Sequence, residues 1–221
     1  MKRIRNKFKK EENVRFISHL DVMRLFERAF RRADIKIAFS KGFNPHPKIS
    51  FGNALMVGAT TDGDYFDVEV CEDILPKDFK NKINNVLPKG IIILESFEVA
   101  NEDILSSRIV AADYLIKFST FENIHDIYDT YKKFIEQPSI EIEKDTKKGK
   151  KVIDIKAYII ETKLLFYDGK MGEIYVKLKL GEGTPTPLHL LKAFNDFLDG
   201  LINLENYKLK REKIILDTDM R

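Results

Sequence analysis

The sequence predicts an α+β fold made of two tandem ferredoxin-like units, each with the element order βαββαβ. Three observations lead to this prediction. Apolar residues alternate with a period of two in several short segments, and they recur every three to four residues in others. The order of these two kinds of segment then repeats once along the 221 residues. We expect a first unit over residues 1–104 and a second over 105–221.

In the first unit, Ile4, Asn6 and Phe8 alternate with basic residues, which indicates a half-buried strand over 2–9. Ser18 is a typical N-cap residue, and the acidic residue three positions later forms a variant of the capping box, so a helix is expected over 18–33. The remaining expected elements are strands over 49–60 and 64–71 joined by a turn at 61–64, a helix over 76–87 and a strand over 91–99.

The second unit repeats this order with additions. Expected strands cover 112–118, 139–144, 150–167, 173–180 and 206–216, and expected helices cover 123–135 and 187–199. Segment 144–151 holds five lysines and is expected to be an exposed hairpin tip. Gly181 and Gly183 precede a helix and could present amides to an anion, but the Walker A lysine and the G-x-G-x-x-G spacing are absent.

Composition excludes several classes of protein. Hydrophobic residues make up 43% of the chain and charged residues 33%, which is enough apolar material for a packed core. No apolar run approaches the ~20 residues that a membrane helix needs, and the basic start of the chain does not resemble a signal peptide. The single cysteine, Cys71, excludes an internal disulfide and a cysteine-rich metal site within these residues. We therefore expect a cytoplasmic protein that has no membrane segment.

The charge is unevenly distributed. Residues 1–51 hold fourteen Lys and Arg against five Asp and Glu, although the whole chain has a net charge of only +3. The other residues together are therefore acidic. A basic N-terminal segment followed by an acidic remainder favours an anionic partner at one end of the chain.

Arginines occupy one face of the predicted helix over 18–33, opposite its apolar stripe. They are Arg24, Arg28, Arg31 and Arg32. Such a row is suited to phosphate groups, and RNA is the expected partner. The alternative is an ordinary solvated face with local pairs such as Glu27–Arg31.

A stiff loop follows, in which Pro45 and Pro47 bracket His46. The polar and aromatic candidates for RNA contact in it are Lys41, Phe43, Asn44 and Lys48. Phe43 follows a glycine and is the better candidate for base stacking, whereas Phe39 and Phe51 are expected in the core.

His46 and His19 are the candidate catalytic residues. A histidine titrates near neutral pH and can move a proton from a ribose hydroxyl or an attacking water. The alternative is that His19 packs against its helix and that His46 only stiffens its loop. No metal site is expected, because His19 and Asp21 at i,i+2 do not face one another on a helix. No bound cofactor is expected either.

Three stretches resemble a known family. They are RFISHLD over 15–21, RLFERA over 24–29 and FSKGFNPHPKISFG over 39–52. They are similar to the radical-SAM-linked bacterial family of unknown function, whose members occur alone or joined to radical-SAM modules. The resemblance implies a bacterial cytoplasmic protein that works beside a radical-SAM enzyme, and it assigns no catalytic residue.

These observations favour an RNA-binding accessory protein that works with a radical-SAM enzyme in RNA modification or processing and that is not a catalyst by itself. One alternative is a metal-independent RNA-processing or RNA-modifying enzyme that uses His46 or His19. The other is an adaptor whose basic face docks an acidic protein. The sequence leaves open the identity of the RNA, the reaction of the partner and the oligomeric state.

Overall fold

The computed structural model describes residues 1–146, 149–181 and 183–220. The tip of the predicted 144–151 hairpin and the middle of the 181–184 glycine loop lie outside these residues. The chain forms two compact units. The first comprises residues 1–110 together with 211–221, and the second comprises 111–210. The predicted division placed 211–221 with the second unit, whereas these residues pack with the first.

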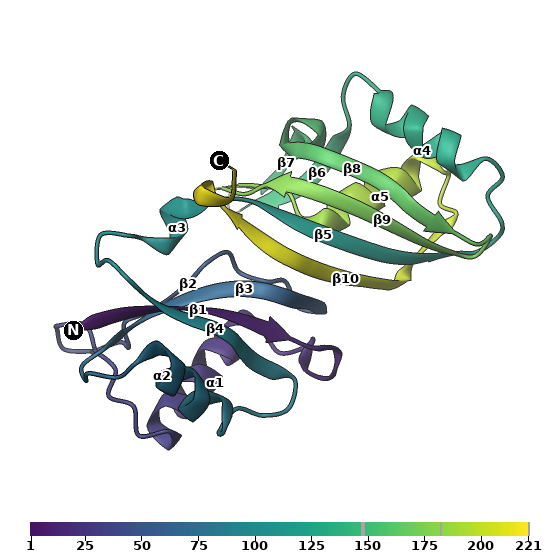
Figure 1. The fold of residues 1–221 in the computed structure, drawn as a ribbon. Coiled ribbons are helices and arrows are strands. Elements are labelled where there is room, and N and C mark those ends of the chain that lie inside the picture. The colour runs from purple at the N-terminus through teal and green to yellow at the C-terminus, as the bar shows by residue number, and fades with distance from the viewer. Residues whose placement is uncertain (147–148, 182, 221) are drawn as a thin grey trace. The chain divides into compact units, whose positions relative to one another are not determined.

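The first unit has strands and helices in alternation (Figure 1). Its strands are β1 (Lys2–Lys10), β2 (Ile49–Phe51), β3 (Ala59–Val70) and β4 (Ile91–Val99). Its helices are α1 (His19–Arg32), α2 (Pro76–Asn84) and the short α3 (Leu105–Arg108), with a 3-10 turn at Glu12–Val14. Residues 211–216 of β10 (Ile202–Leu216) also belong to this unit, followed by a 3-10 turn at Asp217–Met220.

The sheet of the first unit is antiparallel around β1, which pairs with β3 on one side and with β4 on the other. The short β2 pairs with β3 through Ile49↔Val68 and Phe51↔Phe66. Helices α1 and α2 cover the same face of this sheet (Figure 1). The described part of the chain contains no helix long and apolar enough to cross a membrane.

The core of the first unit lies between the sheet and these two helices. Phe26 and Phe30 of α1 are fully buried, and the ring of Phe26 lies 4.5 Å from that of Phe66 on β3. Ile4 and Phe8 of β1 are buried in the same cluster, as their alternation predicted. Ser18 caps α1 by accepting a hydrogen bond from the Asp21 amide at 3.2 Å, also as predicted.

The predicted turn at 61–64 is wrong, because β3 runs without a break from Ala59 to Val70. The extra residue of this segment is absorbed as a bulge, since Phe8 pairs with Asp64 and Lys10 with Thr61. Gly63 lies close to both flanking segments at this point, since a Cβ there would lie 2.9 Å from Lys7 Cε and 3.4 Å from the Glu212 carbonyl oxygen. Pairing with neighbouring strands therefore overrides the local turn signal.

The second unit contains a three-stranded antiparallel arrangement of β5 (Ile109–Thr120), β9 (Met171–Lys179) and β8 (Ile159–Tyr167). Residues 202–210 of β10 lie in the same unit. A separate hairpin pairs β6 (Glu141–Thr146) with β7 (Gly149–Asp154). The predicted strand over 150–167 is therefore two strands, separated by a 3-10 turn at Ile155–Tyr158.

Two helices complete the second unit, α4 (Ile127–Glu136) and α5 (Pro187–Phe197). The ring of Phe194 on α5 lies 4.9 Å from that of Tyr131 and 5.1 Å from that of Phe134, both on α4. Ile174, Val176 and Leu178 of β9 are fully buried, whereas the residues between them are not. One face of this sheet is therefore buried, and the other is partly exposed. The architecture is mixed α and β, in keeping with the predicted α+β class.

Candidate nucleic-acid interface and the His19 pocket

Helix α1 presents its arginines to solvent because its apolar stripe faces the sheet. Val22, Phe26, Ala29 and Phe30 are buried, whereas the four arginines predicted to share the other face are exposed. We call Arg24, Arg28, Arg31 and Arg32 the basic face. Arg31 and Arg32 lie in the last turn, where a positive charge interacts favourably with the helix dipole.

The basic face is little neutralised by nearby acids. Arg24 lies 3.7 Å from Asp21, and both side chains are more than half exposed. Among the described residues, Arg28, Arg31 and Arg32 make no ion pair, and the local Glu27–Arg31 pair considered above does not form. The ion pair that does form is weak, because solvent screens exposed charges.

The loop that follows α1 is closed at its base by two hydrogen bonds. The Ser40 amide donates to the His46 carbonyl oxygen at 2.8 Å, and the His46 amide donates to Ser40 Oγ at 2.9 Å. Phe43 at the tip is fully exposed. Lys41, Asn44 and His46 are exposed as well, and among the described residues the His46 imidazole makes no hydrogen bond or ion pair.

Two residues of this region lie differently from expectation. Phe39 was expected in the core but is half exposed, because it pairs with Pro47 at the base of the projecting loop. Lys48 is not free, since its ammonium group donates to Glu69 Oε2 at 2.7 Å. This hydrogen bond, assisted by Arg3, lowers the pKa of Glu69.

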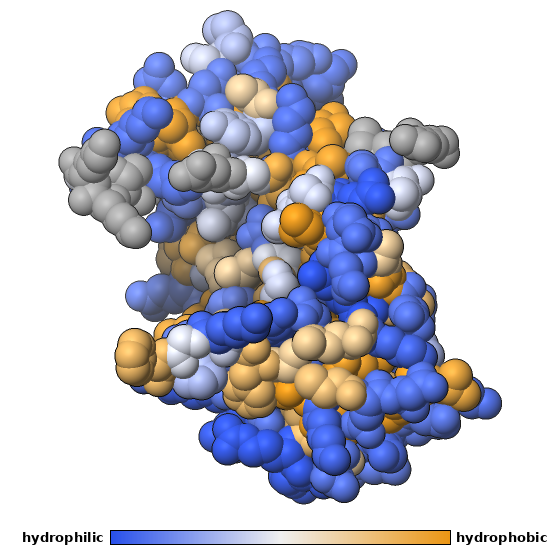
Figure 2. All heavy atoms as spheres, turned by 90° about the vertical axis from the view of Figure 1, so that its left-hand side faces the viewer, coloured by the Kyte–Doolittle hydropathy of each residue, from blue (hydrophilic) through white to orange (hydrophobic). Residues whose placement is uncertain are grey.

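Figure 2 shows one face of the first unit in its lower half, where hydrophilic residues surround a smaller apolar patch.

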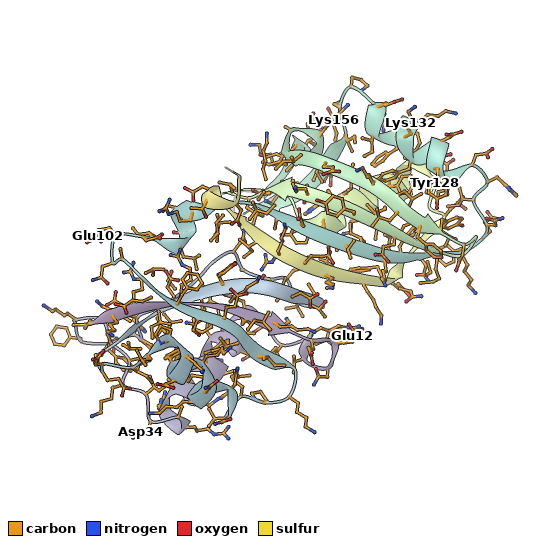
Figure 3. The ribbon with its side chains drawn as sticks, in the orientation of Figure 1. Glu12, Asp34, Glu102, Tyr128, Lys132 and Lys156 are labelled. Atoms are coloured by element: carbon orange, nitrogen blue, oxygen red, sulfur yellow. The ribbon has the colours of Figure 1, made fainter. Side chains whose placement is uncertain are left out.

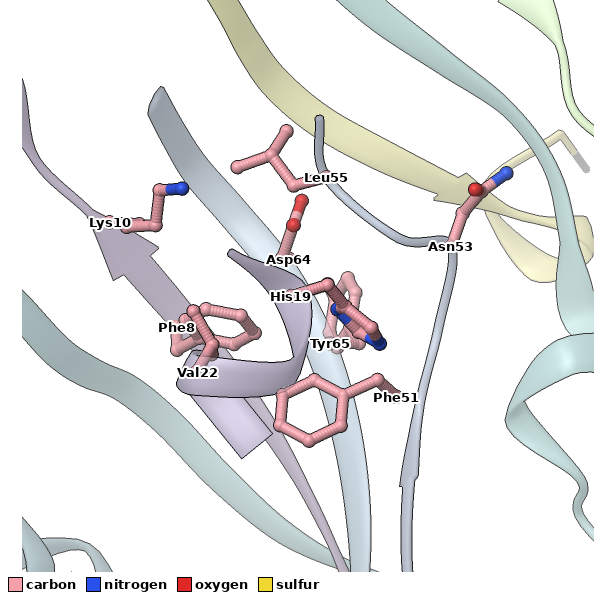
Figure 4. Close-up of a pocket in the computed structure, with 9 residues that line it drawn as sticks. All are labelled: Phe8, Lys10, His19, Val22, Phe51, Asn53, Leu55, Asp64 and Tyr65. Atoms are coloured by element: carbon pink, nitrogen blue, oxygen red, sulfur yellow. The ribbon is translucent and has the colours of Figure 1, made fainter. Parts of the chain in front are cut away.

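His19 lines a small pocket within the first unit (Figure 4). The other residues of its wall are Phe8, Lys10, Val22, Phe51, Asn53, Leu55, Asp64 and Tyr65. The cavity measures about 10 Å³, which is space for about one water molecule. The His19 ring meets the Phe51 ring edge-on, with centroids 5.3 Å apart.

Burial lowers the pKa of His19 from its ordinary value of 6.5. Asp64 opposes this shift, whereas the positive charges of Arg211 and Lys10 reinforce it. The imidazole is therefore neutral at pH 7, in the form that accepts a proton. His19 thus has the protonation state of a general base, and His46 has no comparable surroundings.

The pocket is held by a buried ion pair that joins β3 to β10. Arg211 Nε donates to Asp64 Oδ1 at 2.7 Å, and Arg211 Nη2 donates to Asp64 Oδ2 at 2.5 Å. Asp64 and Arg211 are 3% and 1% exposed. Arg211 Nη2 also donates to the Asn53 carbonyl oxygen at 2.8 Å, so the pair fixes the loop that forms one wall. This bidentate geometry is the strongest form of an arginine–carboxylate contact.

Lys10 is the second buried cation near His19. Its ammonium group donates to the carbonyl oxygens of Arg15 and Ile17, at 3.1 and 3.4 Å. Burial lowers its pKa, and the attraction of Asp64 offsets part of this effect. Lys10 therefore holds the turn that leads into α1 and places His19 at the pocket.

Sequence reasoning missed Lys10, Asp64 and Arg211 as parts of this site. One signal was present, because Arg211 falls two residues after Leu209 in an alternating segment and so shares its inward face. A charged residue at such a position indicates a buried partner. Among the described residues, no group of three or more His, Cys, Asp or Glu side chains is arranged to hold a metal ion.

These features define an α+β protein with an exposed basic helix face and, in its first unit, a small pocket lined by His19. The chain belongs to the family described as an uncharacterized protein conserved in bacteria (DUF2344), whose model matches residues 3–188. No curated protein matches the chain.

The fold is similar to that of a chain in the crystal structure of a Cbf5–Nop10–Gar1 complex, with a TM-score of 0.54 and 9% identity over 94% of this chain and 48% of the other. It is also similar to a chain in the structure of an H/ACA RNP bound to a substrate RNA containing 2′-deoxyuridine, with a TM-score of 0.50 and 10% identity over 95% and 46%. The chain thus spans about half the length of these solved chains. At these identities the likeness concerns the fold alone.

Replacing Arg211 with leucine leaves the Asp64 carboxylate buried without its partner. We expect Arg211→Leu to lower the free energy of unfolding by about 3–5 kcal/mol in urea titrations. The double variant R211L/D64L removes both charges and should recover most of this loss. An Arg211→Leu variant as stable as the wild type would show that the ion pair does not hold this part of the unit.

The lowered pKa of His19 makes stability depend on pH. The unfolded chain binds the proton more tightly than the folded chain, so stability falls as the pH drops from about 7 through the pKa of the folded imidazole. In His19→Gln the loss between pH 7 and pH 5 should be smaller. NMR titration of His19 should give a pKa below 6.5, and a value at or above 6.5 would contradict this account.

Proposed function

We propose that the chain is an RNA-binding accessory protein of the bacterial cytoplasm that works with a radical-SAM enzyme in RNA modification or processing. Its proposed scaffold is the tandem of ferredoxin-like units expected from the sequence. The observation that carries the proposal is the exposure of Arg28, Arg31 and Arg32 without an ion pair among the described residues. Cations that the chain does not neutralise are available to phosphate groups.

The contrast with other basic groups of the same unit supports this reading. Arg5 forms a bidentate contact with Asp67 at 2.8 and 2.9 Å, and Arg211 does the same with Asp64. Lys48 is held by Glu69. These groups stabilise the fold, whereas the arginines of α1 make no comparable contact. A face on which most arginines lack an acidic partner is typical of a surface that meets a polyanion.

The 40–46 loop supplies a second kind of contact. Phe43 is fully exposed at its tip between Lys41 and Asn44, and the closed base of the loop fixes the backbone beneath it. An exposed ring on a stiff loop binds an unpaired base by stacking, which is worth about 1–3 kcal/mol per base. The proposed interface therefore combines phosphate contacts from α1 with stacking at Phe43, and Lys48 contributes least because it is already paired.

The radical-SAM partner rests on the resemblance of residues 15–52 to the radical-SAM-linked family. The proposal of RNA as a partner is based on the exposed arginines of the basic face. The likeness in fold to a chain of an RNP bound to a substrate RNA is compatible with it.

Reversing three charges on the basic face tests RNA binding. Arg24→Glu, Arg28→Glu and Arg31→Glu together should abolish most binding of single-stranded RNA in filter assays. The slope of log K against log salt should fall by about 2, because each phosphate contact contributes about 0.7. The slope is measured between 50 and 200 mM salt.

The matched control reverses three exposed lysines of the second unit, Lys132, Lys133 and Lys192. Lys132 points outward from α4 (Figure 3). This variant changes the net charge by the same amount and should bind RNA nearly as the wild type does. Equal losses in the two variants would indicate general electrostatics, and unchanged binding in both would contradict the proposal. A pull-down with and without RNase would then show whether the basic face binds an acidic protein instead.

A second candidate function is a metal-independent RNA-processing or RNA-modifying enzyme that uses His19 or His46. The observation that favours it is the neutral, half-buried His19 in the wall of the pocket. A neutral imidazole can accept the proton of a ribose hydroxyl. Of the two histidines, the surroundings favour His19.

Incubation of the full chain with total bacterial RNA in EDTA tests the cleavage form of this function. Discrete products should appear with the wild type, disappear in His19→Ala and persist in His46→Ala. Circular dichroism shows whether each variant is folded. The absence of products with the wild type would remove the cleavage form and leave the accessory role as the better account.

A further inference from the structure

Strand β8 ends the sheet of the second unit. It pairs with β9 on one side, and among the described residues no strand pairs with its other side. An edge of this kind presents unpaired backbone N–H and C=O groups along its length. Ile160, Leu165 and Phe166 on the same strand are 44–50% exposed. The edge is thus available to another strand.

The opposite face of this sheet carries a row of alternating charges, which is buried at Asp113 and becomes exposed toward the β8 edge. Asp113 on β5 pairs with Lys177 on β9, and Lys177 pairs in turn with Glu161 on β8. Lys177 Nζ lies 3.8 Å from Asp113 Oδ1. The sign changes at each strand, and cross-strand pairs of opposite charge stabilise a sheet. A positive residue beside Glu161 would continue the row.

The next residue of β8 on this face is Lys163, whose ammonium group lies 2.8 Å from Glu161 Oε1. The Lys163 side chain is 66% exposed and that of Glu161 42%. Between them, Thr162 points to the buried face, where Tyr131 donates to it at 2.6 Å and it donates to the Tyr175 carbonyl oxygen at 2.8 Å. The strand is therefore fixed to α4, with its charged pair directed to the opposite side.

We propose that the β8 edge binds the β8 edge of a second copy of this chain, antiparallel and with the two-fold axis at Thr162. In this register Glu161 of each copy lies opposite Lys163 of the other. The charge row then continues from Glu161 to Lys163 of the second copy. In the sequence IIETKLL over 159–165, the apolar residues at each end also lie opposite apolar residues of the other copy. The interface is isologous, as in most soluble homodimers.

The charges select this register against its neighbours. If the axis lay at Glu161, two glutamates would face one another, and if it lay at Lys163, two lysines would. Like charges directly opposite one another destabilise a strand pair. Two bulges, at Ile160 and Leu165, bound the regular segment. They restrict pairing to a short central stretch, so the charge pair decides which strand can bind.

Charge reversal on the full chain tests the proposal, with molar mass measured by sedimentation equilibrium at 50 mM salt. The wild type should be a dimer whose dissociation constant rises with salt. Glu161→Lys and Lys163→Glu should each be monomeric, because residues 161 and 163 then carry the same charge and lie opposite one another across the interface. Mixed in equal amounts, the two variants should form a heterodimer, and the charge-swapped E161K/K163E should restore the homodimer.

Lys132→Glu on the outer face of α4 is the matched control and should leave the dimer unchanged. Circular dichroism and thermal melting confirm that each variant is folded, and recovery on mixing excludes loss of folding as the cause of dissociation. A wild type that is monomeric up to about 100 μM, or a dimer that survives both single reversals, would overturn the proposal. The same is true if the two variants fail to associate on mixing.

Discussion

The buried pair of Asp64 and Arg211 is the interaction on which the first unit depends. Removing two charges from water is costly, and the cost is offset only when the geometry is close to ideal and the remaining donors are satisfied. Here both conditions hold, because two parallel hydrogen bonds join the groups and Arg211 also binds the Asn53 carbonyl oxygen. The pair attaches residues 211–216 to a unit otherwise built from the first half of the chain, and it sets the position of the loop beside His19.

The basic residues of the first unit fall into two groups, those paired with a carboxylate and those exposed to solvent. Arg5, Lys48 and Arg211 have carboxylate partners within the first unit, so they contribute to its structure. Arg28, Arg31 and Arg32 have none among the described residues and point to solvent. The basic residues of the first unit therefore have two roles. Those on α1 and at the tip of the 40–46 loop are exposed and available to a partner.

Features set by local sequence could be predicted, and those set by distant pairing could not. Ser18 and the apolar stripe define α1, and the short apolar run at 91–94 marks β4. The turn at 61–64 failed because strands from distant parts of the chain flank Gly63. For the site, periodicity was enough to place the four arginines on the exposed face. The partners of His19 and Lys48 were not accessible in this way, because Asp64 and Arg211 are 147 residues apart and Glu69 meets Lys48 only once β3 is formed.

The proposed RNA interface is α1 together with the loop after it. Ultraviolet crosslinking of single-stranded RNA to the full chain, followed by mass spectrometry of the crosslinked peptides, locates the RNA. We expect crosslinks within residues 24–48, with Phe43 among the modified residues, and their loss as salt is raised. Crosslinks confined to the second unit, or none at concentrations where RNA binds, would contradict it.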